Sequence, residues 1–98
     1  MNKFLKKDER DVRDVHLASI LWAAGCRFTR CFKQDGWIHY VYKTKVVAPF
    51  LEKHYHGELV INSQEFITGL SYARLMIEDT PEEPESATSL RAAGRIPK

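Results

Sequence analysis

The chain has 98 residues, of which 44% are apolar, and its formal net charge is +2. This length fits one domain, and the apolar share is typical of a folded protein rather than of a chain disordered throughout. So weak a positive charge does not by itself indicate a polyanionic partner, because nucleic-acid-binding domains usually carry a concentrated basic excess. No apolar core of a signal peptide and no run of ~20 apolar residues is present. We therefore expect a cytoplasmic protein without a membrane anchor.

Changes in composition divide the chain into three parts. Residues 1–11 are strongly charged, and we expect them to form a loose lead-in or one additional helical turn. Residues 12–79 hold nearly all of the periodic apolar positions and are predicted to form the single domain. Residues 80–98 begin with an acidic, proline-containing run and hold few apolar residues, so we predict a disordered tail.

The segment 14–25 has the periodicity of an amphipathic helix. Its apolar residues recur at spacings of three and four and form one broad stripe: Val15, Leu17, Ala18, Ile20, Leu21 and Ala24. Either Asp11 or Asp14 is placed to cap the N-terminus, because a carboxylate accepts hydrogen bonds from the unpaired backbone N–H groups there. Gly25 suits the left-handed position that follows a helix, and we predict that the helix ends there.

Two strands joined by a tight turn are predicted next. Residues 26–32 alternate between two faces, and Arg30 falls on the apolar one, which indicates a bulge or an edge strand. Residues 34–36, Gln-Asp-Gly, favour a hairpin turn because Asp-Gly tolerates the positive φ angles that such a turn requires. Residues 37–42 are substantially apolar on both faces, which indicates a central strand.

A second helix, a short strand and a third helix are expected after the hairpin. Pro49 lacks a backbone donor, so we place it in the first turn of a helix that begins near Val47. Residues 58–61 predict a third strand, and Asn62 or Ser63 then caps the last helix. The buried stripe of that helix is predicted to consist of Phe66, Ile67, Leu70, Ala73, Leu75 and Ile77.

The predicted order of elements is therefore α-β-β-α-β-α. An α+β fold accounts for it, with helices packed on a three-stranded, mostly antiparallel sheet. The third strand could pair with either edge of the hairpin, and the sequence does not decide between the two.

This pattern resembles a family of small bacterial and phage-associated domains of unknown function. The matching pieces are residues 17–25, 37–42, 51–57 and 60–70, and the stretch that contains them makes up just over half of the chain. The resemblance implies a bacterial or phage origin and brings no catalytic residues with it.

Two groups of cysteine and histidine residues contain the side chains that metal binding or nucleophilic catalysis would need. Cys26, Cys31, His39, His54 and His56 contain the atom types that bind zinc, but their spacing fits the usual close ligand pairs poorly. Cys31 and His39 would be neighbours across the hairpin in only one of several registers, and no third orienting group is evident. The two cysteines lie about 16 Å apart in an extended strand, too far for a disulfide, so we predict free thiols in a reducing compartment. We predict no metal, no cofactor and no enzymatic activity.

A basic and aromatic surface on the hairpin is the predicted binding site. Its candidate residues are Arg27, Arg30, Lys33, Trp37, His39, Lys43 and Lys45. Cations neutralise phosphates and flat rings stack on unpaired bases, so a nucleic-acid-binding accessory protein is one hypothesis. The hypothesis we prefer is a small noncatalytic interaction module that binds a protein partner or a second copy of itself, as a homodimer, through the hairpin face or a sheet edge.

Overall fold

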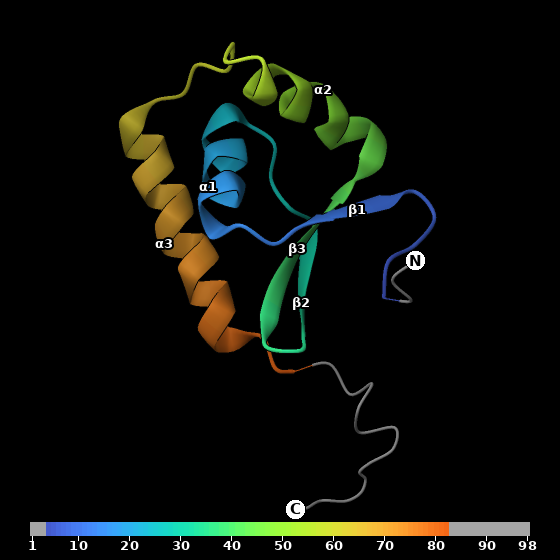
Figure 1. Ribbon diagram of the computed structural model, residues 1–98. Helices are drawn as coiled ribbons and strands as arrows, with labels where there is room; N and C mark the ends of the chain where they lie inside the picture. The colour runs from blue at the N-terminus through green and yellow to red at the C-terminus, as the bar shows by residue number, and fades with distance from the viewer. Residues whose placement is uncertain (1–3, 83–98) are drawn as a thin grey trace, which may run out of the picture.

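Three antiparallel strands and three helices make up residues 4–82, the part of the chain that the computed structural model describes. The elements are β1 (Glu9–Val12), α1 (Val15–Ala24), β2 (Arg30–Gln34), β3 (Trp37–Lys43), α2 (Thr44–Tyr55) and α3 (Ser63–Asp79). Helices α1 and α3 lie side by side, and α2 runs across one end of them (Figure 1). The α+β class and the three-stranded antiparallel sheet are confirmed, but the order is β-α-β-β-α-α rather than α-β-β-α-β-α.

The third strand is β1, and its predicted position at residues 58–61 is wrong. β1 pairs antiparallel with β3, from Glu9 opposite Lys43 to Val12 opposite Tyr40. It forms within the segment that we expected to be a loose lead-in. Residues 58–62 instead connect α2 to α3 without regular structure, and Val60 is 90% exposed. Because β1 and β2 already occupy both sides of β3, the apolar run at 58–61 has no place beside that strand.

The hairpin between β2 and β3 forms as predicted. Asp35 and Gly36 have φ angles of 54° and 81°, the left-handed values that a two-residue turn requires. The strand order is β1-β3-β2, so β3 is the central strand as predicted, and β2 is an edge strand, which is one of the two alternatives left open for it. β2 begins only at Arg30, and residues 26–29 approach the sheet without regular structure.

The core lies between the sheet and the helices α1 and α3. Ile38, Tyr40 and Tyr42 project from β3 into it and are joined there by Leu21 of α1 and Ala73 of α3. The hydroxyl of Tyr40 donates a hydrogen bond of 2.7 Å to the backbone carbonyl of Ala73. This bond satisfies a polar group that would otherwise be buried without a partner.

Local signals set three of the helix ends as predicted. The Asp14 carboxylate accepts hydrogen bonds from two backbone N–H groups at the start of α1. The side chain of Asn62 accepts two equivalent bonds at the start of α3. Gly25, with φ 102°, ends α1 in the left-handed conformation.

Helix α2 begins earlier than predicted. It starts at Thr44, directly after β3, so Pro49 lies inside the helix and not in its first turn. The missing proline N–H leaves the carbonyl of Lys45 without its helical donor. Both Pro49 and Lys45 are exposed, so water can take that hydrogen bond. The tail predicted over 80–98 lies outside the described residues from position 83 onward.

Helices α1 and α3 meet where Gly69 faces Trp22. A Cβ atom added at Gly69 would lie 2.9 Å from both Cβ and Cγ of Trp22. Gly69 and Ala73 are both buried and lie one turn apart, so they give α3 a narrow face on which α1 packs closely. The Trp22 ring then lies 4.7 Å from that of Tyr72, measured between ring centroids.

We expect Gly69→Ala to lower the free energy of unfolding, although alanine is the better helix former by ~1 kcal/mol. The added methyl group would overlap the Cβ of Trp22, which cannot rotate away, and overpacking of this kind costs ~1–3 kcal/mol. Urea unfolding should therefore show a net loss of about 1 kcal/mol. Ser71→Ala on the exposed side of α3 is the control and should be neutral or slightly stabilising. A Gly69→Ala variant more stable than the parent would contradict this packing.

Candidate binding surface

The outer face of the sheet, which points away from α1 and α3, carries four of the seven predicted binding residues. The strand register places alternate side chains there: Glu9, Asp11, Arg30, Phe32, Gln34, Trp37, His39, Val41 and Lys43. Lys33 projects from β2 to the other face, Arg27 precedes β2, and Lys45 lies on α2. The structure therefore brings Arg30, Trp37, His39 and Lys43 onto one face and leaves the other three apart.

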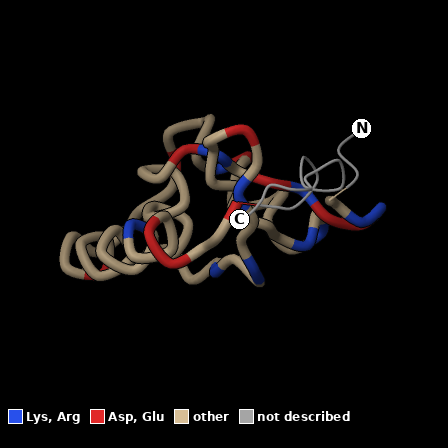
Figure 2. Tube along the Cα trace, turned by 90° about the horizontal axis from the view of Figure 1, so that it is seen from below, with Lys and Arg blue, Asp and Glu red and all other residues tan. Residues whose placement is uncertain are grey.

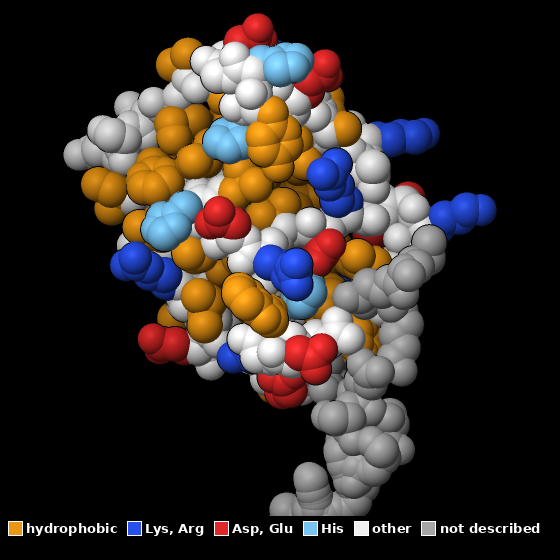
Figure 3. All heavy atoms as spheres, viewed as in Figure 1, with side chains coloured by type: hydrophobic (Ala, Val, Ile, Leu, Met, Phe, Trp, Pro, Cys, Tyr) orange, Lys and Arg blue, Asp and Glu red, His pale blue; other side chains and the backbone are white. Residues whose placement is uncertain are grey.

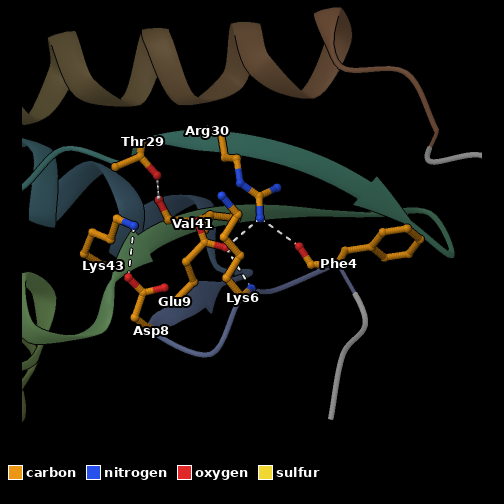
Figure 4. A network of polar contacts seen from close by, with 8 residues as sticks. All are labelled: Phe4, Lys6, Asp8, Glu9, Thr29, Arg30, Val41 and Lys43. Atoms are coloured by element: carbon orange, nitrogen blue, oxygen red, sulfur yellow. Dashed lines mark hydrogen bonds and ion pairs between the residues drawn. The ribbon is translucent and has the colours of Figure 1, made fainter.

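Arg30 is held in an internal network (Figure 4). Its Nη2 donates to Oε1 of Glu9 and to the backbone carbonyl of Phe4, each at 2.7 Å. The backbone N–H of Lys6 also donates to Oε1 of Glu9, at 2.9 Å. The hydrogen bond from Arg30, followed by the one from Lys6, lowers the pKa of Glu9 to about 2. The guanidinium joins the N-terminal segment to β2 and is not free for a phosphate.

Lys43 at the other end of the outer face is also paired. Its Nζ donates to the carboxylate of Asp8 at 3.1 Å, and both side chains are exposed (Figure 4). The hydrogen bond from Lys43 is the main cause of a lowered Asp8 pKa. Water screens an exposed pair of this kind, so the contact orients the two side chains more than it holds the fold.

His39 is buried at the centre of the outer face, with 5% of its surface exposed. Its Nδ1 donates to Oδ2 of Asp11 at 2.6 Å, which links β3 to β1. Its ring stacks on that of Phe32, with 4.4 Å between centroids and 10° between planes. Phe4 packs against Phe32 from the N-terminal segment. His39 is therefore a structural residue, stacked on Phe32 and hydrogen-bonded to Asp11.

The three cations away from the outer face do not extend it. The Nζ of Lys33 donates to the backbone carbonyl of Ile77 at 2.7 Å and so fixes β2 to the end of α3. The guanidinium of Arg27 lies 4.3 Å from the centre of the Trp22 ring, a cation–π contact. Lys45 is exposed at the start of α2.

On the outer face, Trp37 is the predicted binding residue that remains open to a partner. Its side chain is 58% exposed, and the Arg13 guanidinium lies 5.7 Å from the centre of its ring. Arg13, Asp14, Val15 and Trp37 line an open pocket of about 520 Å³. Sequence reasoning missed Arg13, because only the pairing of β1 with β3 brings it beside the hairpin. The sequence feature that could have indicated it is the spacing of Glu9, Asp11 and Arg13, because alternate residues share one face of a strand.

The cysteines and histidines do not form a reactive group within residues 4–82. Cys31 lies opposite Tyr40 and His39 opposite Phe32, so the proposed neighbours Cys31 and His39 project to different faces of the hairpin. Burial raises the pKa of Cys31 to about 11 and also raises that of Cys26. Across these described residues, no three side chains among His, Cys, Asp and Glu converge as a metal site.

Large apolar side chains are exposed mainly on the helices. In the described part of the chain they are Trp37, Val46, Tyr55, Val60, Ile67, Tyr72 and Leu75. Six of these seven belong to α2, α3 and the segment between them. Figure 3 shows apolar side chains at the surface over this helical part of the molecule.

The charges of residues 4–82 are balanced. This part of the chain has as many lysines and arginines as aspartates and glutamates, and the two signs are interspersed along the trace (Figure 2). Among its helices, none has the length and apolarity needed to cross a bilayer. Of the cations expected on the hairpin surface, Arg30 and Lys43 are paired with carboxylates.

The Glu9–Arg30 pair predicts how stability depends on pH. Because the folded-state pKa of Glu9 is about 2 against an ordinary 4.5, its contribution is complete above about pH 4.5 and is lost as the pH falls toward 2. Glu9→Gln should therefore be less stable than the parent at pH 7, and the difference should shrink by pH 3. Urea unfolding at both pH values measures this, with the exposed Glu52→Gln as the control. A difference that does not change with pH would contradict the pairing.

The raised thiol pKa values predict low cysteine reactivity. At pH 7 the thiolate fraction of Cys26 and Cys31 is small, and a thiol must ionise to attack a disulfide reagent. We expect Ellman's reagent to modify both cysteines slowly in the folded protein and rapidly in urea. Modification of the folded protein as fast as in urea would restore the nucleophile hypothesis.

No family model, curated protein or solved structure matches this chain. The bacterial or phage origin implied by the resemblance stays a prediction. Function is therefore inferred from the surface of the molecule itself.

Proposed function

We propose that the protein is a small noncatalytic interaction module that associates with a second copy of itself through its helices. The observation that carries the proposal is the group of apolar side chains exposed on α2, α3 and their connection. We call Val46, Tyr55, Val60, Ile67 and Leu75 the helical side; Tyr72 is left out because its ring packs against Trp22. Exposed apolar groups of this kind mark interaction sites when they gather on one part of a molecule.

The exposed residues of α3 lie opposite its buried face. Gly69 and Ala73 pack toward the core, while Ile67, Ser71 and Leu75 follow one another at spacings of four and share the other side. Ile67 is 61% exposed. The small Ser71 between two large apolar residues leaves room for a second helix to approach.

Charge complementarity favours a second copy as the occupant. α2 carries Lys45 and Lys53 with one acidic residue, whereas α3 carries Glu65, Glu78 and Asp79 with one basic residue. None of these five side chains has an ion-pair partner within residues 4–82. A twofold arrangement that sets α2 of one copy against α3 of the other would pair opposite charges twice and cover the helical side.

The structure favours this role over nucleic-acid binding and over catalysis. Arg30 and Lys43 are paired with carboxylates and Lys33 with a carbonyl, so no concentrated basic surface remains among the described residues. His39 and Cys31 face opposite sides of the hairpin, so they cannot act as a nucleophile and its base.

Sedimentation velocity of the full chain across a range of concentrations tests self-association. We expect a concentration-dependent dimer, and the double variant Ile67→Ser, Leu75→Ser should weaken it by about ten-fold or more. Both residues are exposed, so the substitutions should leave the fold intact, which circular dichroism checks. Higher salt should weaken the dimer because it screens the charge pairs.

Trp37→Ser is the matched control, because Trp37 is equally exposed but lies on the hairpin. It should dimerise as the parent does. A parent protein that stays monomeric at the highest concentration, or a dimer weakened only by the control, would exclude self-association through the helical side.

A further inference from the structure

The chain leaves the described fold beside the hairpin turn. Glu82, the last residue that the structure describes, pairs with Lys33 of β2 in a parallel bridge. Because the bridge is parallel, the chain at Glu82 runs in the direction of β2, toward the turn at residues 35–36. Figure 1 shows the end of α3 and this segment next to that turn. Trp37 follows the turn directly, so the residues after Glu82 begin close to it.

The open pocket beside Trp37 combines a flat ring with an unpaired cation. Trp37 is 58% exposed, and the Arg13 guanidinium lies 5.7 Å from the centre of its ring. Arg13 has no ion pair within residues 4–82. The Asp14 carboxylate also lines the pocket, but it is engaged by two backbone N–H groups of α1. Arg13 is therefore the charged group of the pocket that is available to a ligand, and the ligand it favours carries a carboxylate.

The residues that follow Glu82 have the matching chemistry. They are Glu83, Pro84, Glu85 and Ser86. Exposed aromatic rings are the groups on which proteins bind proline side chains, because the flat surfaces pack together at little cost in conformational entropy. A glutamate next to the proline supplies the carboxylate.

The distance from Glu82 to the pocket is short. Glu82 lies beside β2, and β3, which carries Trp37, is the next strand, so two strand spacings of about 5 Å separate them. Three or four extended residues span about 10 Å at roughly 3.3 Å each. Arg13 follows β1, which lies on the far side of β3. A segment that starts at Glu82 therefore reaches Trp37 before it reaches Arg13.

We propose that residues 83–86 bind in the pocket of the same chain, with Pro84 against the Trp37 ring and the Glu85 carboxylate paired with Arg13. The segment then shields the exposed aromatic residue of the outer face, and a partner that uses Trp37 must displace it. Tethering makes a weak contact sufficient, because a short linker gives an effective concentration in the millimolar range. This contact is independent of the proposed dimer, since it uses the hairpin and not the helical side.

The segment is favoured over a nucleic acid by the charges at the pocket. Arg13 alone gives little attraction for a polyanion, since Arg30 and Lys43 on the outer face are already paired. The carboxylate of Asp14 repels phosphates, whereas the packing of Pro84 on Trp37 adds a contact that does not depend on charge.

NMR of the isotope-labelled full chain tests the contact. We expect nuclear Overhauser contacts between the Pro84 ring and the Trp37 indole, and a shift of the Trp37 indole N–H signal in the double variant Pro84→Ser, Glu85→Ser. Glu85→Gln alone should move that signal about half of the way, because it removes the charge that meets Arg13 and leaves the proline in place.

Glu83→Gln is the matched control, because it removes the same charge on the other side of Pro84. It should leave the Trp37 indole signal unchanged. Equal shifts from Glu83→Gln and Glu85→Gln, or the absence of any contact between Pro84 and Trp37, would overturn the proposal.

Dilution distinguishes binding within one chain from binding to a second copy. The Trp37 signal should be the same from about 0.05 to 1 mM protein, and also in the variant Ile67→Ser, Leu75→Ser, whose dimer is weakened. A contact that appears only at high protein concentration would contradict binding within one chain. Because dimerisation is measured separately by sedimentation, failure of this contact leaves the proposed dimer standing.

Discussion

The pairing of β1 with β3 is the constraint on which the rest of the molecule depends. It supplies the third strand, and two side-chain contacts across strands hold it: Glu9 with Arg30, and Asp11 with His39. The first of these contacts neutralises Arg30, a cation that would otherwise have been available on the outer face of the hairpin. The same strand stops at Val12, so it pairs with β3 only from Tyr40 to Lys43. One short polar segment thus decides which charged groups of the outer face remain available to a partner.

Features set by neighbouring residues could be predicted from the sequence. Asp14, Gly25 and Asn62 act on the backbone within a few residues, and the Asp35–Gly36 turn needs only its own φ angles. The short strand β1 could not be predicted in this way. Three of its four residues are charged, and its partners lie 21 and 28 positions away in the sequence. Its stability comes from contacts that no local pattern contains.

The candidate binding residues also include some whose positions follow from the local sequence and some whose positions depend on distant strands. Trp37 was correctly identified as a hairpin residue, and it is exposed. His39 was predicted from the same basic and aromatic pattern, but it is buried. Its partners Asp11 and Phe32 come from the two strands on either side of β3, and the local pattern contains neither contact. Arg13 was missed because it lay in a segment without a predicted partner. Conversely, Val60 was expected in a strand and is exposed in a connection, since β1 had taken the available side of β3.

Residue-resolved amide hydrogen exchange of β3 tests the central pairing most directly. The N–H groups of Tyr40, Tyr42 and Thr44 point toward β1, and we predict slow exchange for all three. The N–H of Ile38 points in the same direction but meets no strand, so its exchange should be much faster. Fast exchange at Tyr42 would show that β1 does not pair with β3, and exchange at Ile38 as slow as at Tyr40 would show that β1 continues past Val12.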